Sequence, residues 1–497
     1  MLLNDDYNCR FMEQKDTPQG MQGKKSPLTI IVVAIVVIVI IAAGVSLYLN
    51  NQPAKSNKTV LTVNISLAPS EYAYYNSTLK PEFQQMYPNV TIQFTTQSAS
   101  TVVSTLQAQE PTPTIDVVQQ DNGFIGPLVS SGLVMNLTPY LSQLEPMNSS
   151  ATATAANGSI IPAYYNEGNF SGTFYFFPIR GNVQLAYYNQ SALTKVKESG
   201  YTNVTAPTNV TNLKADMWDL NNYSLTHNGL FKNPFNMMGH GGASTPTQVF
   251  QWMAEFGGNP MAFNTTGDIA ALTFLQNMEK SGLMSPSNAT GYWGSYKGLM
   301  SNSYQYIDQW PYVTSIFANN GWNNTTIAPH NVTSGKELGL NYVFKGPNNT
   351  AQFIVGGDAL GIVKNTPHLW AALHWIQFLD SKKVQIQLMQ NLTWPVVNEA
   401  AYSTPSAQSL QFKLIKYEES NGIFRPAVPW MTQWDNYFDS AWSVIMNGGN
   451  VSHALSQAHA SMYNYLKIYY GGTAYPSEYQ NGTIIPSGAY LGPKSTS

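Results

Sequence analysis

Polar side chains that could bind a small hydroxyl-rich molecule follow apolar segments at three places in the chain. Asp121 and Asn122 come after an apolar strand pattern and before a glycine and a helix pattern. Arg180 and Asn182 stand where another strand pattern is interrupted, and Asp358 lies between glycine and a short apolar strand. Open α/β sheets bind ligands at the carboxyl ends of their strands. Carboxylate, amide and guanidinium groups pair well with hydroxyls, so the chemistry these residues suggest is recognition of hydroxyl groups.

Each of these residues also has a purely structural interpretation. Asp121 or Asn122 could cap the helix that follows. Arg180 could form an internal ion pair, and its partner would be informative because charges are scarce. Asp358 could cap a turn. The stretch Tyr175–Asn189, which holds Arg180 and Asn182, could be an ordinary β-turn between two strands.

Catalytic signatures are few. The sequence contains no Gly-X-Ser-X-Gly elbow, no His-Glu-X-X-His and no phosphate loop. Its only cysteine is Cys9, so we expect no disulfide, no thiolate metal site and no catalytic thiol. We therefore predict no metal and no cofactor. A glycoside hydrolase stays open as an alternative because it needs only two carboxylates at the right separation.

The composition points away from nucleic acid and towards export. Only 10% of the 497 residues are charged, the net charge is −3, and no basic run is longer than a lysine pair such as Lys24 and Lys25. The charge of a surface with so few ionisable groups changes little as pH falls, which suggests that the protein works in an acidic environment outside the cell. Asn-X-Ser/Thr sequons number on the order of twenty, which suggests an exported glycoprotein.

The N-terminal segments predict a membrane anchor. Residues 28–49 carry no charge and are long enough to cross a bilayer at about 1.5 Å per residue. Lys24 and Lys25 precede them, so residues 1–27 should be a cytoplasmic leader and the chain after the 50–57 linker should lie outside. This layout resembles the pilin-like signals of some archaeal binding proteins. A pilin-like surface subunit is the structural alternative, and the large ectodomain disfavours it.

Strand and helix patterns alternate in the first part of the ectodomain. Residues 59–66, 89–94 and 115–118 read as strands and 101–108 as a helix, which predicts βαβ units and a mainly parallel sheet. Later segments show apolar periods near 3.6 and predict helices at 247–256, 266–281, 369–380 and 451–466.

Five sequence blocks, in order, resemble the family 1 extracellular solute-binding proteins of ABC importers. They are residues 114–141, the stretch 178–193, Phe256–Pro260, the return segment 356–381 and the block from Arg425 to Met431 with Trp434 and Gly448. The resemblance implies that Tyr175–Asn189 is the first crossing between two lobes, with its two strands in different lobes. It covers roughly residues 59–470.

The resemblance also implies which residues face the ligand. It favours Asp121, Asn122 and Asp358 as hydroxyl partners and aligns Asn182 with a polar residue of the cleft. Trp310, in a Trp-Pro segment, is the expected stacking ring, and the remaining candidates are His240, Trp394 and Trp434.

We therefore expect an α/β, two-lobe periplasmic-binding-protein-like fold behind an N-terminal membrane helix. Lobe I should hold residues 58–182 and 356–424, lobe II residues 185–352 and 428–475, and residues 476–497 a tail. The expected function is a membrane-anchored extracellular receptor that closes on a sugar and delivers it to an ABC permease, without catalysis and without nucleic acid.

Overall fold

The structure is a computed structural model that describes residues 58–469, except 145–159, 162–163, 165, 171–172, 202–203, 205–207, 230–232, 238–243, 285–290, 325–334 and 427. The predicted leader, membrane helix, linker and tail lie outside the described residues, as does His240. No helix in the described part is long and apolar enough to span a membrane.

The first of two large sheets contains the N-terminal strands. Its order is β13-β12-β3-β1-β2, and β6 also pairs with β12. The predicted strands at 59–66, 89–94 and 115–118 correspond to β1, β2 and β3. The bounds are β1 (Thr59–Asn64), β2 (Val90–Thr95), β3 (Val117–Asp121), β6 (Phe176–Val183), β12 (Phe353–Ile362) and β13 (Gly422–Phe424).

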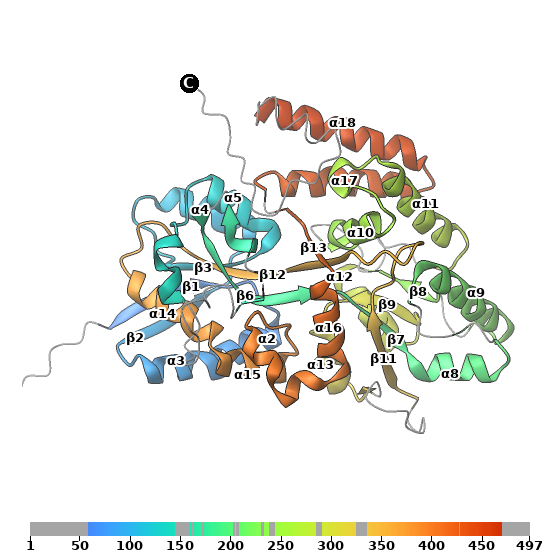
Figure 1. Cartoon of the computed structure of the whole chain (residues 1–497), viewed down its shortest axis with the longest axis horizontal. Helices are drawn as coiled ribbons and strands as arrows, with labels where there is room; N and C mark the ends of the chain where they lie inside the picture. The colour runs from blue at the N-terminus through green and yellow to red at the C-terminus, as the bar shows by residue number, and fades with distance from the viewer. Residues whose placement is uncertain are drawn as a thin grey trace, which may run out of the picture. The chain divides into compact units, whose positions relative to one another are not determined.

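Helices cover both faces of this sheet (Figure 1). On one face, Leu61 and Val63 of β1 join a core with Phe83 and Trp375. On the other face, Val118 of β3 packs in a core with residues of two short helices. The covering helices are α2 (Pro69–Tyr74), α3 (Lys80–Met86), α14 (Leu369–Asp380) and α15 (Lys382–Leu392) on the first face, and α4 (Ala99–Gln109) and α5 (Ile125–Ser130) on the second.

The second sheet has the order β10-β11-β7-β9-β8. Ala186 and Tyr188 of β7 face one core, whereas Leu185 and Tyr187 face the other, which is the alternation expected of a strand buried on both sides. The bounds are β7 (Leu185–Asn189), β8 (Phe235–Asn236), β9 (Tyr306–Gln309), β10 (Asn323–Asn324) and β11 (Glu337–Tyr342).

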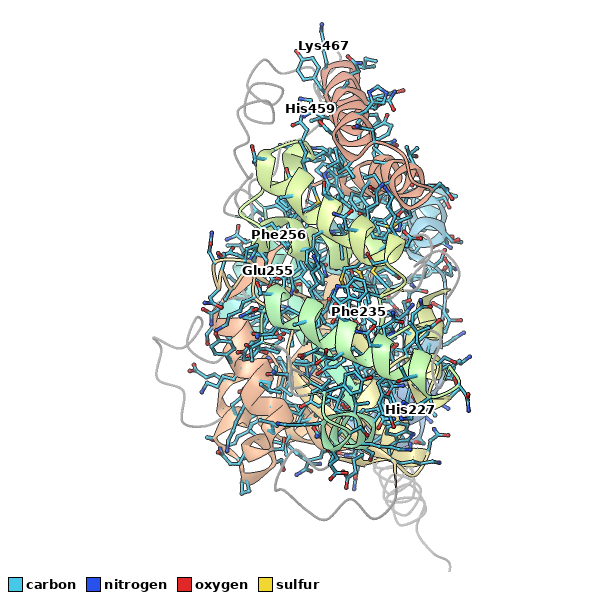
Figure 2. The ribbon with its side chains drawn as sticks, turned by 90° about the vertical axis from the view of Figure 1, so that its right-hand side faces the viewer. His227, Phe235, Glu255, Phe256, His459 and Lys467 are labelled. Atoms are coloured by element: carbon cyan, nitrogen blue, oxygen red, sulfur yellow. The ribbon has the colours of Figure 1, made fainter. Side chains whose placement is uncertain are left out.

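Eight helices in the described part of the chain surround the second sheet. Figure 2 views them from outside, with Glu255 at the end of α10 and His459 on α18 labelled. Their bounds are α8 (Gln190–Glu198), α9 (Val210–Thr226), α10 (Ser244–Glu255), α11 (Thr266–Lys280), α12 (Gly291–Met300), α13 (Val313–Asn319), α17 (Met431–Met446) and α18 (Val451–Tyr469). The smaller described elements are α6 (Leu141–Leu144), the β4 (Asn169–Phe170) and β5 (Thr173–Phe174) pair, and α16 (Leu410–Ser420).

The chain crosses between the two sheets on a ribbon of two paired strands, β6 and β12, which we call the crossing ribbon. β6 belongs to the first sheet and β7 to the second, with only Gln184 between them, so the two strands of Tyr175–Asn189 lie in different sheets. The predicted interruption at Arg180 and Asn182 is wrong, because β6 runs through both residues in its pairing with β12. β11 of the second sheet is followed by β12 of the first, which carries the chain back. β6 and β12 pair from Val183↔Val355 to Phe176↔Gly361 and run side by side through the centre of Figure 1.

The mainly parallel sheet predicted from residues 59–118 is confirmed for those strands, because β1–β2 and β1–β3 are parallel, as is β12–β13. The centre of the fold differs: β12 is antiparallel to both β3 and β6, and β7 is antiparallel to β9 and β11. One strand leaves the first sheet where its neighbour returns, so the two must run in opposite directions. A pattern of alternating strands and helices does not reveal this reversal.

Candidate functional site

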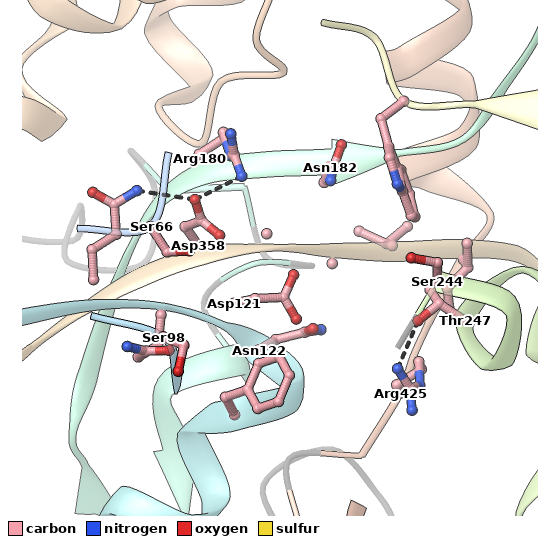
Figure 3. Close-up of a pocket in the computed structure, with 18 residues that line it drawn as sticks. Ser66, Ser98, Asp121, Asn122, Arg180, Asn182, Ser244, Thr247, Asp358 and Arg425 are labelled. Carbon is pink, nitrogen blue, oxygen red and sulfur yellow. Dashed lines mark hydrogen bonds and ion pairs between the residues drawn. The ribbon is translucent and has the colours of Figure 1, made fainter. Parts of the chain in front are cut away.

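A cavity of about 400 Å³ opens where the two sheets meet (Figure 3). One wall comes from the first sheet, at the ends of β1 and β3 and along β6 and β12. The opposite wall comes from α10 and from the segment after β9. The residues that line it are Ser66, Ser98, Gln119, Gln120, Asp121, Asn122, Phe124, Arg180, Asn182, Ser244, Thr247, Trp310, Ile354, Val355, Gly356, Gly357, Asp358 and Arg425.

A row of charged residues crosses the floor of this cavity. Asp121 on β3, Asp358 on β12 and Arg180 on β6 are direct cross-strand partners. Arg180 Nη2 lies 2.7 Å from Asp358 Oδ2, which also accepts a hydrogen bond from Gln119 Nε2 at 3.0 Å. Strand register therefore brings together three predicted site residues that are far apart in the sequence.

Arg180 is held mainly by the protein itself. Its Nη1 lies 3.1 Å from Glu71 Oε1, and its guanidinium stands 4.4 Å from the centre of the Trp394 ring. Trp394 Nε1 donates to the same Glu71 oxygen at 2.7 Å. Burial opposes the charge, but Asp358 and Glu71 together raise the pKa of Arg180. The ion-pair interpretation of Arg180 is therefore confirmed, although its side chain is still 15% exposed at the cavity.

Asp121 both caps the short helix that follows β3 and lines the cavity. Its Oδ1 accepts a hydrogen bond from Gly123 N at 3.0 Å, as a helix cap does, and the residue also borders the cavity. Burial, and then the nearby Asp358 carboxylate, raises the pKa of Asp121 to about 6. Asp121 forms no ion pair within the described part of the chain, so its carboxyl group is the least committed of those in the cavity.

Asn122 and Asn182 supply neutral amides to the same cavity. Asn122 is 6% exposed, and a Cβ on Gly356 would lie 3.2 Å from Asn122 Nδ2, so the glycine makes room for the amide. Asn182, on β6, is labelled beside the cavity in Figure 3. Glu167 is buried near this group, and burial followed by Asp121 and Asp358 raises its pKa well above the usual range.

The sequence does not single out Arg425 as a site residue. It lies directly after β13, is 4% exposed, lines the cavity and forms a buried ion pair with Asp435 of α17. Its Nη1 also donates to Thr247 Oγ1 of α10 at 2.6 Å. Arg425 opens one of the matched sequence blocks, and the scarcity of charged residues was the signal that could have marked it.

The three predicted tryptophans have three different positions. Trp310 lines the cavity and is 9% exposed, which suits a stacking ring. Trp394 borders a neighbouring cavity, but the guanidinium of Arg180 occupies its face. Trp434 is fully buried and stacks with Phe263 and Phe438 in the core of the second lobe. Its assignment as a cleft ring is therefore wrong, because helical spacing on α17 turns it inward.

The hydrogen-bonding groups of the cavity suit the recognition of a ligand. Both guanidinium groups in its wall already carry carboxylate partners, and the remaining polar groups are hydroxyls, amides and Asp121. Among the described residues, no group of three or more His, Cys, Asp and Glu could hold a metal ion. The lining can hydrogen-bond several hydroxyl groups and stack one apolar ring face.

The sequence profile of the bacterial extracellular solute-binding proteins matches residues 78–413. This chain belongs to that family. Its fold is that of two-lobe, maltose-binding-protein-like structures, and the crossing ribbon and cavity lie where its two sheets meet.

Solved structures support the fold at low sequence identity. The GacH receptor of Streptomyces glaucescens, solved unliganded and with acarbose, gives a TM-score of 0.67 at 15% identity, covering 82% of this chain and 99% of that one. Maltose-bound MalE3 of T. maritima gives 0.67 at 18% identity, covering 82% and 100%. A solute-binding protein of Thermotoga lettingae with α-D-tagatose gives 0.64 at 16% identity, covering 81% and 98%.

Proposed function

We propose that this chain is the extracellular substrate-binding subunit of an ABC importer and that its ligand is a sugar. The observation that carries the proposal is the cavity wall, in which both cations are paired with carboxylates of the protein while Trp310, Asn182 and Asp121 also line the cavity. An anionic ligand would find no unpaired cation in the described lining. A neutral polyhydroxyl ligand would find both hydrogen-bond partners and an aromatic plate. The acarbose, maltose and tagatose complexes of proteins with the same fold are consistent with this choice.

The ligand would act by favouring a closed arrangement of the two lobes. Residues on both sides of the cavity, such as Asp358 and Trp310, would contact the same molecule only when the lobes approach. A ligand that binds the closed state more tightly shifts the equilibrium by that difference in affinity. No cofactor is needed for this step.

Thermal unfolding in the presence of a panel of neutral mono- and oligosaccharides tests the proposal. A ligand that binds only the folded state raises the melting temperature with concentration, and we expect at least one saccharide to do so. Trp310→Ala should weaken the binding of that saccharide by about tenfold or more, because an aromatic contact in a desolvated site contributes roughly 1–3 kcal/mol to binding. An affinity within about twofold of wild type would refute the stacking role.

A glycoside hydrolase is the enzyme alternative, and one observation favours it. Asp121 and Asp358 are cross-strand neighbours, and the pKa of Asp121 is raised to about 6 by burial and then by Asp358. Such a pair could supply the acid and the carboxylate that glycoside hydrolysis needs. Asp358, however, is bound to Arg180 and Gln119, which leaves it poorly placed to attack. Hydrolysis products in the thermal-shift incubations would establish the enzyme instead.

We also propose that residues 28–49 anchor the protein in the cell membrane, with the lobes outside and a permease as partner. The support is the charge-free run and the lysines ahead of it. Fractionation of cells expressing the full chain should place it in the membrane pellet at high salt. Protease added to intact cells should remove the lobes. A soluble protein would contradict the anchor.

A further inference from the structure

A second cavity, of about 320 Å³, adjoins the one already described. Ser66, Arg180 and Asn182 line both cavities, so the two share a boundary at these residues. Each volume alone lies in the lower part of the roughly 300–1,000 Å³ range of small-molecule sites. The cleft therefore has two compartments with Arg180 between them.

Each compartment has its own aromatic wall on the same short segment. Trp310 lines the first compartment and Tyr312 the second, with Pro311 between them. Pro311 O accepts a hydrogen bond from Thr393 Oγ1 at 3.0 Å, which ties the segment to the loop that carries Trp394. Rings of the ligand held in the two compartments would thus be contacted by neighbouring residues of one lobe.

The second compartment is suited to an uncharged group. Its one carboxylate, Glu71, is committed to the protein, because Oε1 accepts from Arg180 Nη1 and Trp394 Nε1 and Oε2 accepts from Ala68 N at 2.8 Å. Arg180, the cation in its wall, is paired with Glu71 and Asp358, and the polar side chains of Ser66 and Asn182 are neutral. A charged ligand group would be desolvated there without a free partner, at a substantial cost in free energy.

We propose that this second compartment binds a second sugar ring, so that the receptor selects a disaccharide or longer saccharide over a monosaccharide. The inference rests on the proposed sugar-binding function and specifies the ligand's length. The first ring lies against Trp310, the second against Tyr312, and Ser66 and Asn182 contact the ligand near the linkage. Arg180 acts as a positioning residue that separates the two rings.

Calorimetric titration of glucose and galactose, and of maltose, cellobiose, lactose and melibiose, tests the inference. For wild type we expect the best disaccharide to bind at least tenfold more tightly than its component monosaccharide. Tyr312→Ala should remove most of that advantage while leaving monosaccharide affinity within about twofold. Ala68→Phe, which fills the second compartment from the start of α2, should have the same effect. Trp370→Ala, a change of a 58% exposed aromatic that lines neither cavity, is the control and should alter nothing.

Equal wild-type affinity for monosaccharide and disaccharide would refute the binding of a second sugar ring in the second compartment. The proposed sugar-binding function would still stand. The same conclusion would follow if Tyr312→Ala and Ala68→Phe weakened both ligand classes equally. Absence of binding for every saccharide would instead refute the proposed function itself.

Discussion

Arg180 shows how a single residue can be essential to a site without being its ligand clamp. It bridges Glu71 and Asp358 and covers the ring of Trp394. These contacts join the start of α2, the returning strand β12 and the loop after α15. Fixing the guanidinium in this way orients Asp358 at the cavity floor. It also leaves Asp121 as the carboxyl group most available to ligand.

Replacing Arg180 with methionine should destabilise the protein strongly. Two buried carboxylates would lose their shared cation, and removing one partner of a buried ion pair typically costs about 3–5 kcal/mol. Urea denaturation would measure the loss in free energy of unfolding. Lys383→Met is the matched control, because Lys383 pairs with Glu82 at an exposed position with 72% of the lysine side chain accessible. Such surface pairs are worth about 0–1 kcal/mol. Similar losses for the two variants would contradict the structural role of Arg180.

At the scale of elements, the crossing ribbon determines where the site forms. β12 pairs with β13, β6 and β3 along its length, and Asp358 lies where β6 and β3 flank it. The close approach of β6 depends on Gly357, because a Cβ there would lie 2.0 Å from the backbone oxygen of Arg180. At the neighbouring Gly356, the atoms nearest to an added Cβ belong to the movable amide of Asn122, the closest at 3.2 Å.

Alanine at these adjacent glycines should therefore have different effects. Gly357→Ala must push two strand backbones apart and should lower the free energy of unfolding by about 1–3 kcal/mol. Gly356→Ala should cost much less stability and instead displace Asn122, weakening ligand binding. Denaturation and calorimetric titration of both variants would separate the two effects. Equal stability of the two variants would show that the ribbon tolerates a wider spacing than the structure indicates.

Local sequence signals predicted many elements well because they depend on local chemistry. The helix predicted at 369–380 coincides with α14, and the one predicted at 266–281 matches α11, which begins with a capping box of Thr265 and Asp268. Strand direction and the second sheet's antiparallel centre depend on pairing between distant segments, which periodicity does not encode.

The same limit applies to the candidate site. Asp121 and Asp358 could be placed at strand ends, but their direct pairing came from the register of β3 with β12. Trp434 could not be told from a cleft aromatic because burial on α17 is decided by neighbours such as Phe263. Thr247, by contrast, gave no signal in the sequence and was missed.

At the scale of the whole molecule, several carboxyl groups are buried without a cation. Glu255, Asp308, Glu418 and Glu419 are all at most 6% exposed and form no ion pair in the described parts of the chain. Glu418 and Glu419 are adjacent on α16, which contacts both β11 of the second sheet and β12 of the first. Glu418 accepts from Val343 N of the second lobe, whereas Glu419 accepts from the hydroxyl of Tyr402.

These groups predict a protein that is most stable in acid. Burial raises the pKa of Glu419 to about 8 despite hydrogen bonds from Tyr164 and Tyr402, and burial raises the pKa of Glu255, Asp308 and Glu418 well above the usual range. A carboxyl whose pKa is higher in the folded state binds its proton more tightly there. The resulting stability is fully present below about pH 4 and is lost as pH rises through the folded pKa.

The melting temperature should accordingly fall by several degrees between pH 5 and pH 9. Glu419→Gln mimics the neutral acid and should reduce that fall, whereas Glu198→Gln, at an exposed position on α8, should leave it unchanged. Scanning calorimetry across this pH range would measure all three proteins. A melting temperature that rises towards pH 9 would contradict the neutral interior carboxyls.

The central claim is that one neutral saccharide is captured in the cleft between the two lobes, and isothermal titration tests it most directly. We expect saturable binding of one saccharide per chain, with a negative heat-capacity change as the cleft buries apolar surface, and an affinity weaker by about tenfold or more in Trp310→Ala. If no neutral saccharide produced binding heat, the cleft would not be a sugar site, whereas saccharide binding that stayed as tight in Trp310→Ala would contradict only the stacking role of Trp310.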